Sequence, residues 1–158
     1  SRRLALLMET ICATGIRVSE LRYITVETVR QAKAAIRMKG KVRTIVIPQR
    51  LCRKLLRYAR EKKIASGEIF LTRSGKSISR RQIWAEMKQL AAAANVEPTK
   101  IFPHNLRHLF ASVYYRAYHD IASLADVLGH ASIETTRIYL AVSSAVHAQR
   151  LEAMHMVT

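Results

Sequence analysis

Carboxylates are scarce in this 158-residue chain, which has 11 Asp and Glu against 27 Lys and Arg. Only two of them are aspartates, Asp120 and Asp126, and the pattern around them predicts that both lie on one helix. Enzymes that process nucleic acids with one or two Mg²⁺ ions gather several carboxylates around the metal. The sequence therefore argues against a two-metal site.

Cysteines and long apolar runs are also scarce. Cys12 and Cys52 form neither a CxxC pair nor a zinc spacing, and each falls in an apolar helical pattern, so we predict two reduced thiols in the core of a cytosolic protein. No apolar run approaches the roughly 20 residues that a membrane span needs, and we recognise no signal peptide. Because Ser1 leads straight into a helical pattern, we expect a piece of a longer protein.

Three familiar sites each lack a required residue. Ser74-Gly-Lys-Ser77 resembles the end of a phosphate-binding P-loop, but Phe70 stands where that motif needs a glycine. His104 and His108 have the spacing of zinc ligands, but Arg107 lies between them and no third ligand follows, which favours one surface histidine and one packed histidine. No Gly-x-Ser-x-Gly motif of a serine hydrolase occurs. We expect neither a metal nor a cofactor.

Positive charge is what the chain has in excess, with a net charge of +16 and a pI near 10.7. Lysines and arginines neutralise phosphates and release their counterions, so a domain this basic favours a polyanionic partner. Nucleic acid is the first candidate and a membrane surface the second. With 49% apolar and 24% charged residues, the chain is apolar enough to fold around a core of its own.

Apolar spacing predicts a mainly α fold with one small antiparallel β-sheet, in a single domain over residues 1–158. Alternation over residues 34–47 predicts a hairpin that turns at Gly40 and ends at Pro48. In the first half of the chain we also predict helices over residues 3–13, 18–24 and 51–63 and a short third strand over 68–72.

In the second half, we predict a helix capped by Ser79, whose inward stripe is Ile83, Met87, Leu90, Ala91 and Ala94. After a connection bracketed by Pro98 and Pro103, a further helix is predicted with Leu106, Leu109, Phe110, Val113 and Ala117 inward. The last predictions are a helix from Asp120 to Gly129, with Ile121, Leu124 and Leu128 inward, and a helical tail over 143–156.

An ordered set of cations and one tyrosine meets the demands of cutting a phosphodiester without metal or water. Such a reaction needs a nucleophile, cations that match the charge of the transition state, a proton for the leaving 5′ oxygen and groups that hold the phosphate in line. Guanidinium groups suit the non-bridging oxygens because each offers a fixed fork of donors. The candidates are Arg17 after the helix break at Gly15, Glu20 on the same face where it can orient Arg17, Lys39 at the hairpin turn, His104 and Arg107 at a helix start, His130 after Gly129, and Tyr139 as the nucleophile.

Each of these residues has a plainer interpretation when it is taken alone. A lone arginine on a helix is usually a solvated charge, and lysines beside a hairpin glycine usually only flank a turn. A Gly-His pair after a helix is most often a C-cap, and Tyr139 alone would be a core tyrosine with a hydrated hydroxyl. The ordered set favours the catalytic interpretation.

Four segments resemble the motifs of the tyrosine recombinases, the phage-integrase and Xer-like family. They are Ala13-Thr-Gly-Ile-Arg-Val-Ser-Glu-Leu21, Lys39-Gly-Lys41 through Pro48, Phe102-Pro-His-Asn-Leu-Arg-His108, and Leu128-Gly-His through Tyr139, in family order and spread over essentially the whole chain. The resemblance implies the fold of that catalytic domain. It further implies that Tyr139 is the nucleophile and that the phosphate pocket is formed by Arg17, Lys39, His104, Arg107 and His130. By the same resemblance, Lys39 protonates the leaving oxygen, Glu20 supports the pocket and His104 helps to activate the tyrosine.

The chain departs from the family pattern at a few positions. Ile16 stands where leucine is usual, and Leu109 where a small hydroxyl residue is common. Lys41 lies two residues from Lys39, and we prefer Lys39 because the family places its lysine immediately before the glycine. Relatives carry an N-terminal DNA-clamping domain, so the resemblance implies that this chain is a C-terminal fragment.

The resemblance implies a site-specific DNA recombinase or integrase of a mobile genetic element, which cleaves one strand at a time through a 3′-phosphotyrosyl intermediate without metal or ATP. It implies a bacterial or phage-encoded protein of the cytoplasm, associated with the nucleoid, that acts on double-stranded DNA as a homo-oligomer, a tetramer. Relaxation of supercoils in the manner of a type IB topoisomerase and a DNA-binding module without activity are the alternatives.

Basic and polar residues outside the pocket are candidates for DNA contacts, because they fall in predicted turns or at a helix start. The tail over residues 144–156 is a candidate contact with a neighbouring protomer, or else packs within its own chain. We expect Tyr139 to lie away from the pocket when DNA is absent, because its segment follows a helix end. The DNA-contact candidates are Lys41, Arg43, Arg73, Lys76, Ser79, Arg80, Arg81 and Gln82, and the alternative for each is a solvated surface side chain.

Overall fold

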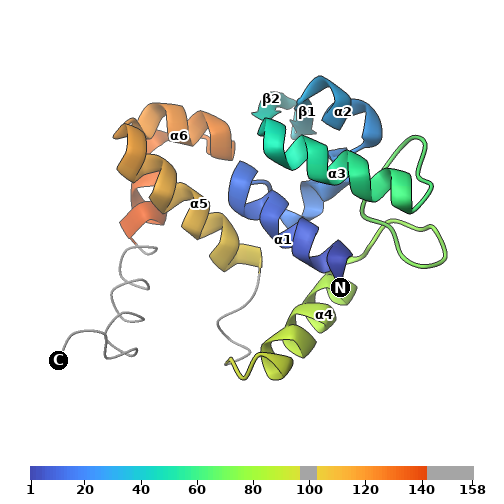
Figure 1. Cartoon of the computed structure of the whole chain (residues 1–158). Helices are drawn as coiled ribbons and strands as arrows, with labels where there is room; N and C mark the ends of the chain where they lie inside the picture. The colour runs from blue at the N-terminus through green and yellow to red at the C-terminus, as the bar shows by residue number, and fades with distance from the viewer. Residues whose placement is uncertain (97–102, 142–158) are drawn as a thin grey trace.

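The fold, seen in a computed structural model, is described here for residues 1–96 and 103–141 (Figure 1). It is mainly helical, with one two-stranded antiparallel sheet, as the sequence predicts. The elements are α1 (Arg2–Thr14), the 3₁₀ helix η1 (Val18–Tyr23), α2 (Val26–Gln31), β1 (Lys33–Met38), β2 (Lys41–Val46), α3 (Gln49–Glu61), α4 (Arg80–Ala93), α5 (Pro103–Tyr118), α6 (Ile121–Leu128) and a helix over residues 133–141.

Helix α1 lies at the centre, between α3 on one side and α5 on the other (Figure 1). Leu4, Leu7 and Ile11 recur at helical spacing and are almost completely buried, which explains why this segment is the central one. The helix ends at Gly15, whose backbone is left-handed with φ 72° and whose N–H donates to the carbonyl of Ile11. The predicted helix and its predicted end are confirmed, and the chain after Gly15 turns toward the candidate site.

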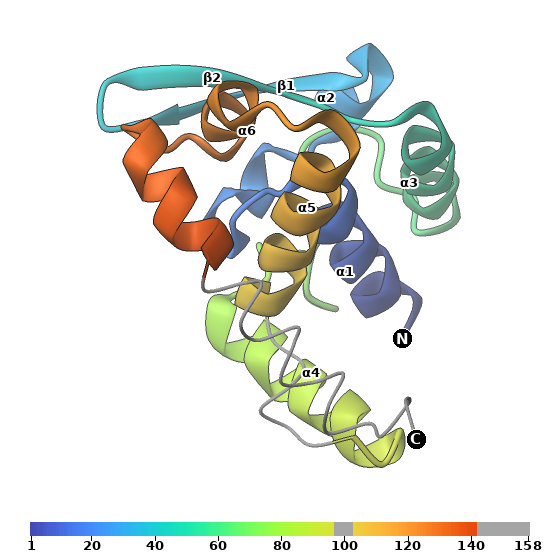
Figure 2. The ribbon, with the colours of Figure 1, turned by 90° about the vertical axis from the view of Figure 1, so that its left-hand side faces the viewer.

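The hairpin of β1 and β2 crosses over α5 and α6, and its turn lies beside the start of the helix over residues 133–141 (Figure 2). Lys39 and Gly40 form the two-residue turn, which confirms the predicted position. Ile36 and Ile45 are buried on the inner face of the hairpin. The hairpin therefore carries Lys39 out to the edge of the fold at the same end as the carboxyl end of α6.

A second, smaller apolar cluster joins α5, α6 and the helix over residues 133–141. Ala111, Leu124 and Leu128 are buried at its centre, and Tyr139 packs against them. Asp120 caps α6 by accepting a hydrogen bond from the backbone N–H of Ser123, as the sequence predicts. This cluster sets how the carboxyl end of α6 and the segment with Tyr139 approach the rest of the fold.

Some details of the prediction are wrong. Residues 68–72 form no strand, because their ladder contacts with the described part of the chain are limited to the single bridges Thr25–Glu68 and Leu71–Ser77. The prediction misses α2, whose six residues are too few to show a full apolar period, although the Thr25 hydroxyl that caps it was a readable signal. Five residues of the predicted inward stripes are exposed, because α4 and α5 bury narrower rows than their apolar positions suggest: Leu90, Ala94, Leu109, Val113 and Ala117.

Two predictions fall outside the described residues. Most of the connection bracketed by Pro98 and Pro103 lies outside the described residues, and the whole tail over residues 144–156 does. Across the ranges 1–96 and 103–141, the structure contains no helix with the length and apolar character to cross a membrane.

Replacing Gly15 by alanine should destabilise the fold more than its backbone strain alone explains. The added Cβ would lie 2.5 Å from Cδ1 of Phe110, so the left-handed strain combines with a steric clash between α1 and α5. We expect the free energy of unfolding to fall by about 2–4 kcal/mol. Urea denaturation of Gly75→Ala is the matched control, because Gly75 has φ 83° and open space around it. Equal losses in the two variants would contradict the clash.

Candidate active site

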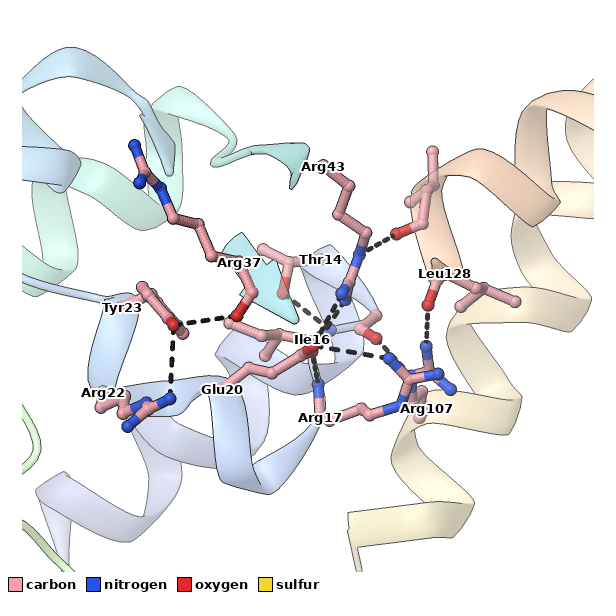
Figure 3. Close-up of polar contacts among 12 residues, drawn as sticks. Thr14, Ile16, Arg17, Glu20, Arg22, Tyr23, Arg37, Arg43, Arg107 and Leu128 are labelled. Carbon is pink, nitrogen blue, oxygen red and sulfur yellow. Dashed lines mark hydrogen bonds and ion pairs between the residues drawn. The ribbon is translucent and has the colours of Figure 1, made fainter. Parts of the chain in front are cut away.

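Arg17, Lys39, His104, Arg107 and His130 come together where the end of α1, the hairpin turn, the start of α5 and the end of α6 meet. Figure 3 shows Arg17, Glu20 and Arg107 in this region. Arg17 lines two neighbouring pockets. His104 and Arg107 line the first with it, whereas Lys39 and His130 line the second, a cavity of about 630 Å³. Four segments that are far apart in the sequence thus supply arginine, lysine and histidine side chains to one region.

Arg107 is the buried centre of the site. Only 4% of the residue is exposed, its Nε donates to the carbonyl of Gly15 at 2.6 Å, and its Nη2 donates to the carbonyl of Leu128. Burial, together with the positive charge of Arg17, lowers the pKa of Arg107 to about 10, so the guanidinium stays charged at neutral pH. Arg107 therefore ties the carboxyl ends of α1 and α6 to α5 and places a charge between them.

Glu20 is a fully buried carboxylate at the start of η1, with 1% of its side chain exposed. Its Oε1 accepts the backbone N–H of Arg17 at 2.9 Å, and Nη1 of Arg17 lies 3.4 Å from Oε2. Burial by itself would raise the pKa of Glu20, but hydrogen bonds from Arg43 and Arg17 outweigh that effect and hold the pKa below its usual value. Glu20 is thus an ionised anchor for the backbone at Arg17, beside Arg17 as the sequence reasoning expects.

Arg43 does not lie where the sequence analysis places it. It belongs to strand β2 rather than to a turn, and only 13% of its side chain is exposed. Its guanidinium points inward, with Nη1 and Nη2 on Glu20 at 2.6 and 2.7 Å and Nε on the carbonyl of Val127 at 3.0 Å (Figure 3). These bonds use the donors that a DNA phosphate would need, so we do not retain Arg43 as a DNA contact.

His130 follows the end of α6, which stops at Gly129 with a left-handed φ of 76°. Nδ1 of His130 lies 2.8 Å from Oγ1 of Thr136, which is itself fully buried. Burial, followed by the charges of Arg107 and Arg17, lowers the pKa of His130 to about 4. The imidazole is therefore neutral at neutral pH and acts as a hydrogen-bonding group rather than as a cation.

The lowered pKa of His130 predicts a loss of stability in mild acid. In the unfolded chain the histidine has a pKa of 6.5 and binds a proton below that pH, whereas in the folded chain it stays neutral down to about pH 4. Between these two pH values the proton binds preferentially to the unfolded chain. The contribution of His130 to the free energy of unfolding is therefore complete above pH 6.5 and is lost as the pH falls toward 4. Urea denaturation at pH 7 and pH 5 should show a smaller pH dependence in His130→Gln than in the wild type. The exposed His119, as His119→Asn, is the control and should leave the dependence unchanged. An equal dependence in all three proteins would contradict the assignment.

Tyr139 lies in the site rather than away from it, so the expectation of a displaced tyrosine is wrong. Its ring stacks on His108, with centroids 3.8 Å apart and planes 22° from parallel, and meets His130 edge to face at 5.2 Å. The Arg107 guanidinium carbon lies 5.7 Å from the ring centroid. Two aromatic rings and a cation hold the ring of Tyr139, and the contacts with His108 and Arg107 form only when α5 and the helix over residues 133–141 pack together.

The hydroxyl of Tyr139 is buried, and within the residues that the structure describes it has no hydrogen-bond partner. Burial raises the pKa of Tyr139, although the charge and the side-chain N–H groups of Arg107, together with the charge of Arg17, lower it in part. The phenol is therefore protonated at neutral pH, and its oxygen lies close to the guanidinium of Arg107. Such an oxygen can become a nucleophile once a base accepts its proton.

The remaining candidates lie around this centre. Lys39 is exposed at the hairpin turn, and His104 is exposed at the start of α5, where its ring meets His108 edge to face at 5.8 Å. The hydroxyl of Ser79 caps α4 through the N–H of Gln82, so it serves the helix. Arg80 lines the first pocket and Lys41 the second, whereas Arg73, Lys76 and Arg81 are exposed. Trp84 also lines the first pocket. The sequence does not single it out as a site residue, although it lies one helical turn after Arg80. No group of three or more potential metal ligands occurs within residues 1–96 and 103–141.

Comparisons with known proteins agree on one family. The profile of the phage integrase family matches residues 1–145. The tyrosine recombinase XerD of Xanthomonas axonopodis pv. citri (strain 306) is 34% identical over 164 residues, which cover 94% of this chain and 53% of that protein. The chain spans about half the length of the curated relatives that it matches.

Solved structures show the same fold. The crystal structure of XerA recombinase matches the whole of this chain with a TM-score of 0.76 and 22% sequence identity. The matched part is 58% of the XerA chain. A second match is the structure of XerH site-specific recombinase bound to difH substrate, in a pre-cleavage complex. The match covers 87% of this chain and 42% of the XerH chain, with a TM-score of 0.73 and 26% sequence identity. The elements that carry the candidate site are thus parts of a fold shared with recombinases.

Proposed function

This chain belongs to the phage integrase family, and on that premise we propose that it cleaves and rejoins DNA at specific sites through a covalent bond between Tyr139 and a 3′ phosphate. The observation that carries the proposal is the position of Tyr139, whose ring lies among His108, His130 and Arg107 and whose hydroxyl is buried. The curated relatives are named tyrosine recombinases, and the XerH neighbour is bound to a DNA substrate, which supports the same chemistry here.

The reaction exchanges one phosphate ester for another. The phenol oxygen of Tyr139 attacks phosphorus as its proton passes to a base, for which the exposed His104 is the candidate. The bond from phosphorus to the 5′ oxygen breaks, and Lys39 at the hairpin turn donates a proton to that oxygen. Because the phosphotyrosyl ester conserves the energy of the broken bond, a 5′ hydroxyl can attack it later and rejoin DNA without ATP.

The cations hold the phosphate and match the charge that develops on it. Arg17 and Arg107 are the candidates for the two non-bridging oxygens, because both line the first pocket and a guanidinium offers several N–H donors. Arg107 would use the donors that the carbonyls of Gly15 and Leu128 leave. Neutral His130 adds a hydrogen bond: when the Thr136 hydroxyl donates to Nδ1, the other ring nitrogen carries the proton and becomes a donor. Glu20 supports this arrangement through the backbone of Arg17.

DNA binding by the rest of the surface follows from the net charge of +16. We propose that exposed or pocket-lining residues contact phosphates or bases. These proposed DNA contacts are Lys41, Arg73, Lys76, Ser79, Arg80, Arg81 and Gln82.

The proposed assembly is a tetramer on double-stranded DNA, since exchange of strands between two duplexes requires four cleavages. The tail over residues 144–156 is the proposed contact between protomers. The proposed location is the bacterial cytoplasm, with the nucleoid as the site of action.

A nicked suicide duplex tests the function. Such a duplex loses a short fragment on cleavage, so the covalent intermediate cannot be resealed and accumulates. We expect a slow-migrating protein–DNA adduct in denaturing gels, formed equally well with and without EDTA. Strand transfer to a second duplex would support recombination, whereas relaxation of supercoiled DNA without transfer would favour the topoisomerase-like alternative. DNA binding without any adduct would indicate the non-catalytic module and contradict the proposal.

A further inference from the structure

Two arginines compete for the one buried carboxylate of the site. Arg43 takes both oxygens of Glu20 with its two terminal nitrogens, at 2.6 and 2.7 Å. Arg17 reaches the same carboxylate only through Nη1 at 3.4 Å and through its backbone N–H at 2.9 Å (Figure 3). The strong, two-pronged pairing thus belongs to Arg43, and the guanidinium of Arg17, whose side chain is 32% exposed, is left with one long contact.

We propose that Arg43 is a positioning residue for the reaction: by holding Glu20 in a two-pronged ion pair, it leaves the guanidinium of Arg17 available for the scissile phosphate. This inference rests on the proposed function. A carboxylate that is 1% exposed cannot remain unpaired at low cost, because burial of a lone charge is strongly unfavourable. Without Arg43, the guanidinium of Arg17 is the one that remains bonded to Glu20 among the described residues, and it would turn away from the phosphate to pair with both oxygens.

The hairpin register explains why an arginine at this position faces inward. Arg43 pairs with Ile36 across the sheet and lies two residues from Ile45, so it shares the face on which both isoleucines are buried. A charge on that face needs a partner, and Glu20 supplies it. Since η1 carries both Glu20 and the backbone after Arg17, the ion pair connects the hairpin directly to the first pocket arginine.

A second contact extends the influence of Arg43 to His130. Its Nε donates to the carbonyl of Val127 at 3.0 Å, and its Cδ lies 2.8 Å from where a Cβ on Gly129 would stand. The residue before His130 must therefore be glycine both for its left-handed φ and for the space that the Arg43 side chain fills. Arg43 thus touches the backbone on which His130 is mounted as well as the partner of Arg17.

A rescue experiment separates positioning from ordinary structural support. Arg43→Met should slow adduct formation at saturating DNA by about ten-fold or more, the change that about 1.4 kcal/mol of lost coupling produces. Glu20→Gln added to it should recover much of that loss, because the amide keeps an acceptor for the N–H of Arg17 but no longer attracts its guanidinium. Arg37→Met is the matched control, since Arg37 loses the same charge from an exposed position on the same hairpin. Arg43→Lys, which keeps the charge but not the fork, should lie between the wild type and Arg43→Met.

A measurement without DNA keeps this inference distinct from the proposed function. The affinity of each protein for inorganic phosphate, followed by ³¹P line broadening, should rank in the same order, with the double variant above Arg43→Met. Urea denaturation checks that every variant is folded. If the wild type binds phosphate and the ranking holds but no protein forms an adduct, the proposed function fails, whereas the effect of Arg43 on phosphate binding by Arg17 stands. Three outcomes would overturn the inference. In the first, the double variant forms adduct and binds phosphate no better than Arg43→Met. In the second, Arg43→Met behaves like Arg37→Met, and in the third the wild type binds no phosphate.

Discussion

Replacement of Tyr139 by phenylalanine is expected to abolish the covalent DNA adduct while the protein stays folded and still binds DNA. The hydroxyl makes no well-aligned hydrogen bond with the described part of the chain, so its removal costs little stability, and the ring can keep its stack on His108. Phenylalanine offers no oxygen to attack phosphorus. We expect the rate of adduct formation to fall by at least about 10³-fold, as is usual when a nucleophile is removed.

Tyr118→Phe is the matched control for this experiment. Tyr118 lies on α5 with 68% of its surface exposed, so the same chemical change occurs far from any phosphate pocket. Adduct formation by that variant should equal that of the wild type, and the urea midpoints of the two Tyr→Phe variants should agree closely. An adduct that persists in Tyr139→Phe would show that a different residue is the nucleophile.

Replacement of Arg107 by methionine is expected to damage both stability and activity. The carbonyls of Gly15 and Leu128 would each lose a buried donor, which predicts a fall in the free energy of unfolding of about 2–5 kcal/mol. The phosphate would lose one of its two guanidinium groups, which predicts a fall in the adduct rate of about 10²–10³-fold in the protein that remains folded. Urea denaturation and the adduct assay at saturating DNA measure the two effects separately.

Arg107→Lys separates those two roles. A lysine can reach one of the two carbonyls and keeps the charge, so part of the stability should return. It cannot bond two carbonyls and also present a fork to phosphate, so the adduct rate should remain low. Arg116→Met, at an exposed position on the same helix, controls for loss of one positive charge on DNA binding. Full activity in Arg107→Lys would contradict a requirement for the guanidinium.

The parts of the fold that the sequence predicts are those with local causes. The apolar row of Leu4, Leu7 and Ile11 defines α1, and left-handed glycines mark its end and that of α6. The hairpin follows from alternation around Gly40. Helix α2 was missed because a six-residue helix shows less than two apolar turns, and the exposed Leu90 and Val113 look inward in the sequence because both sit at helical spacing in apolar stripes.

The parts of the site that the sequence does not predict depend on how distant elements pack. Whether Arg43 faces solvent or Glu20 depends on the hairpin register and on the approach of α6, neither of which the residues around Arg43 specify. The stack of Tyr139 on His108 requires α5 to lie against the helix over residues 133–141, so neither motif alone reveals it. Arg17 and Arg107 were identifiable because the local sequence places one after a helix break and the other at a helix start.

The measurement that tests the central claim most directly is mass-spectrometric mapping of the adduct. The wild-type chain would be incubated with the nicked suicide duplex in EDTA, the DNA digested to a short remnant and the protein cut with trypsin. We predict that the remnant is a nucleotide joined through its 3′ phosphate to Tyr139, in the peptide that begins at Ile138. A remnant on any other side chain, a 5′ linkage, or cleavage that requires a divalent metal and leaves no remnant would contradict the account.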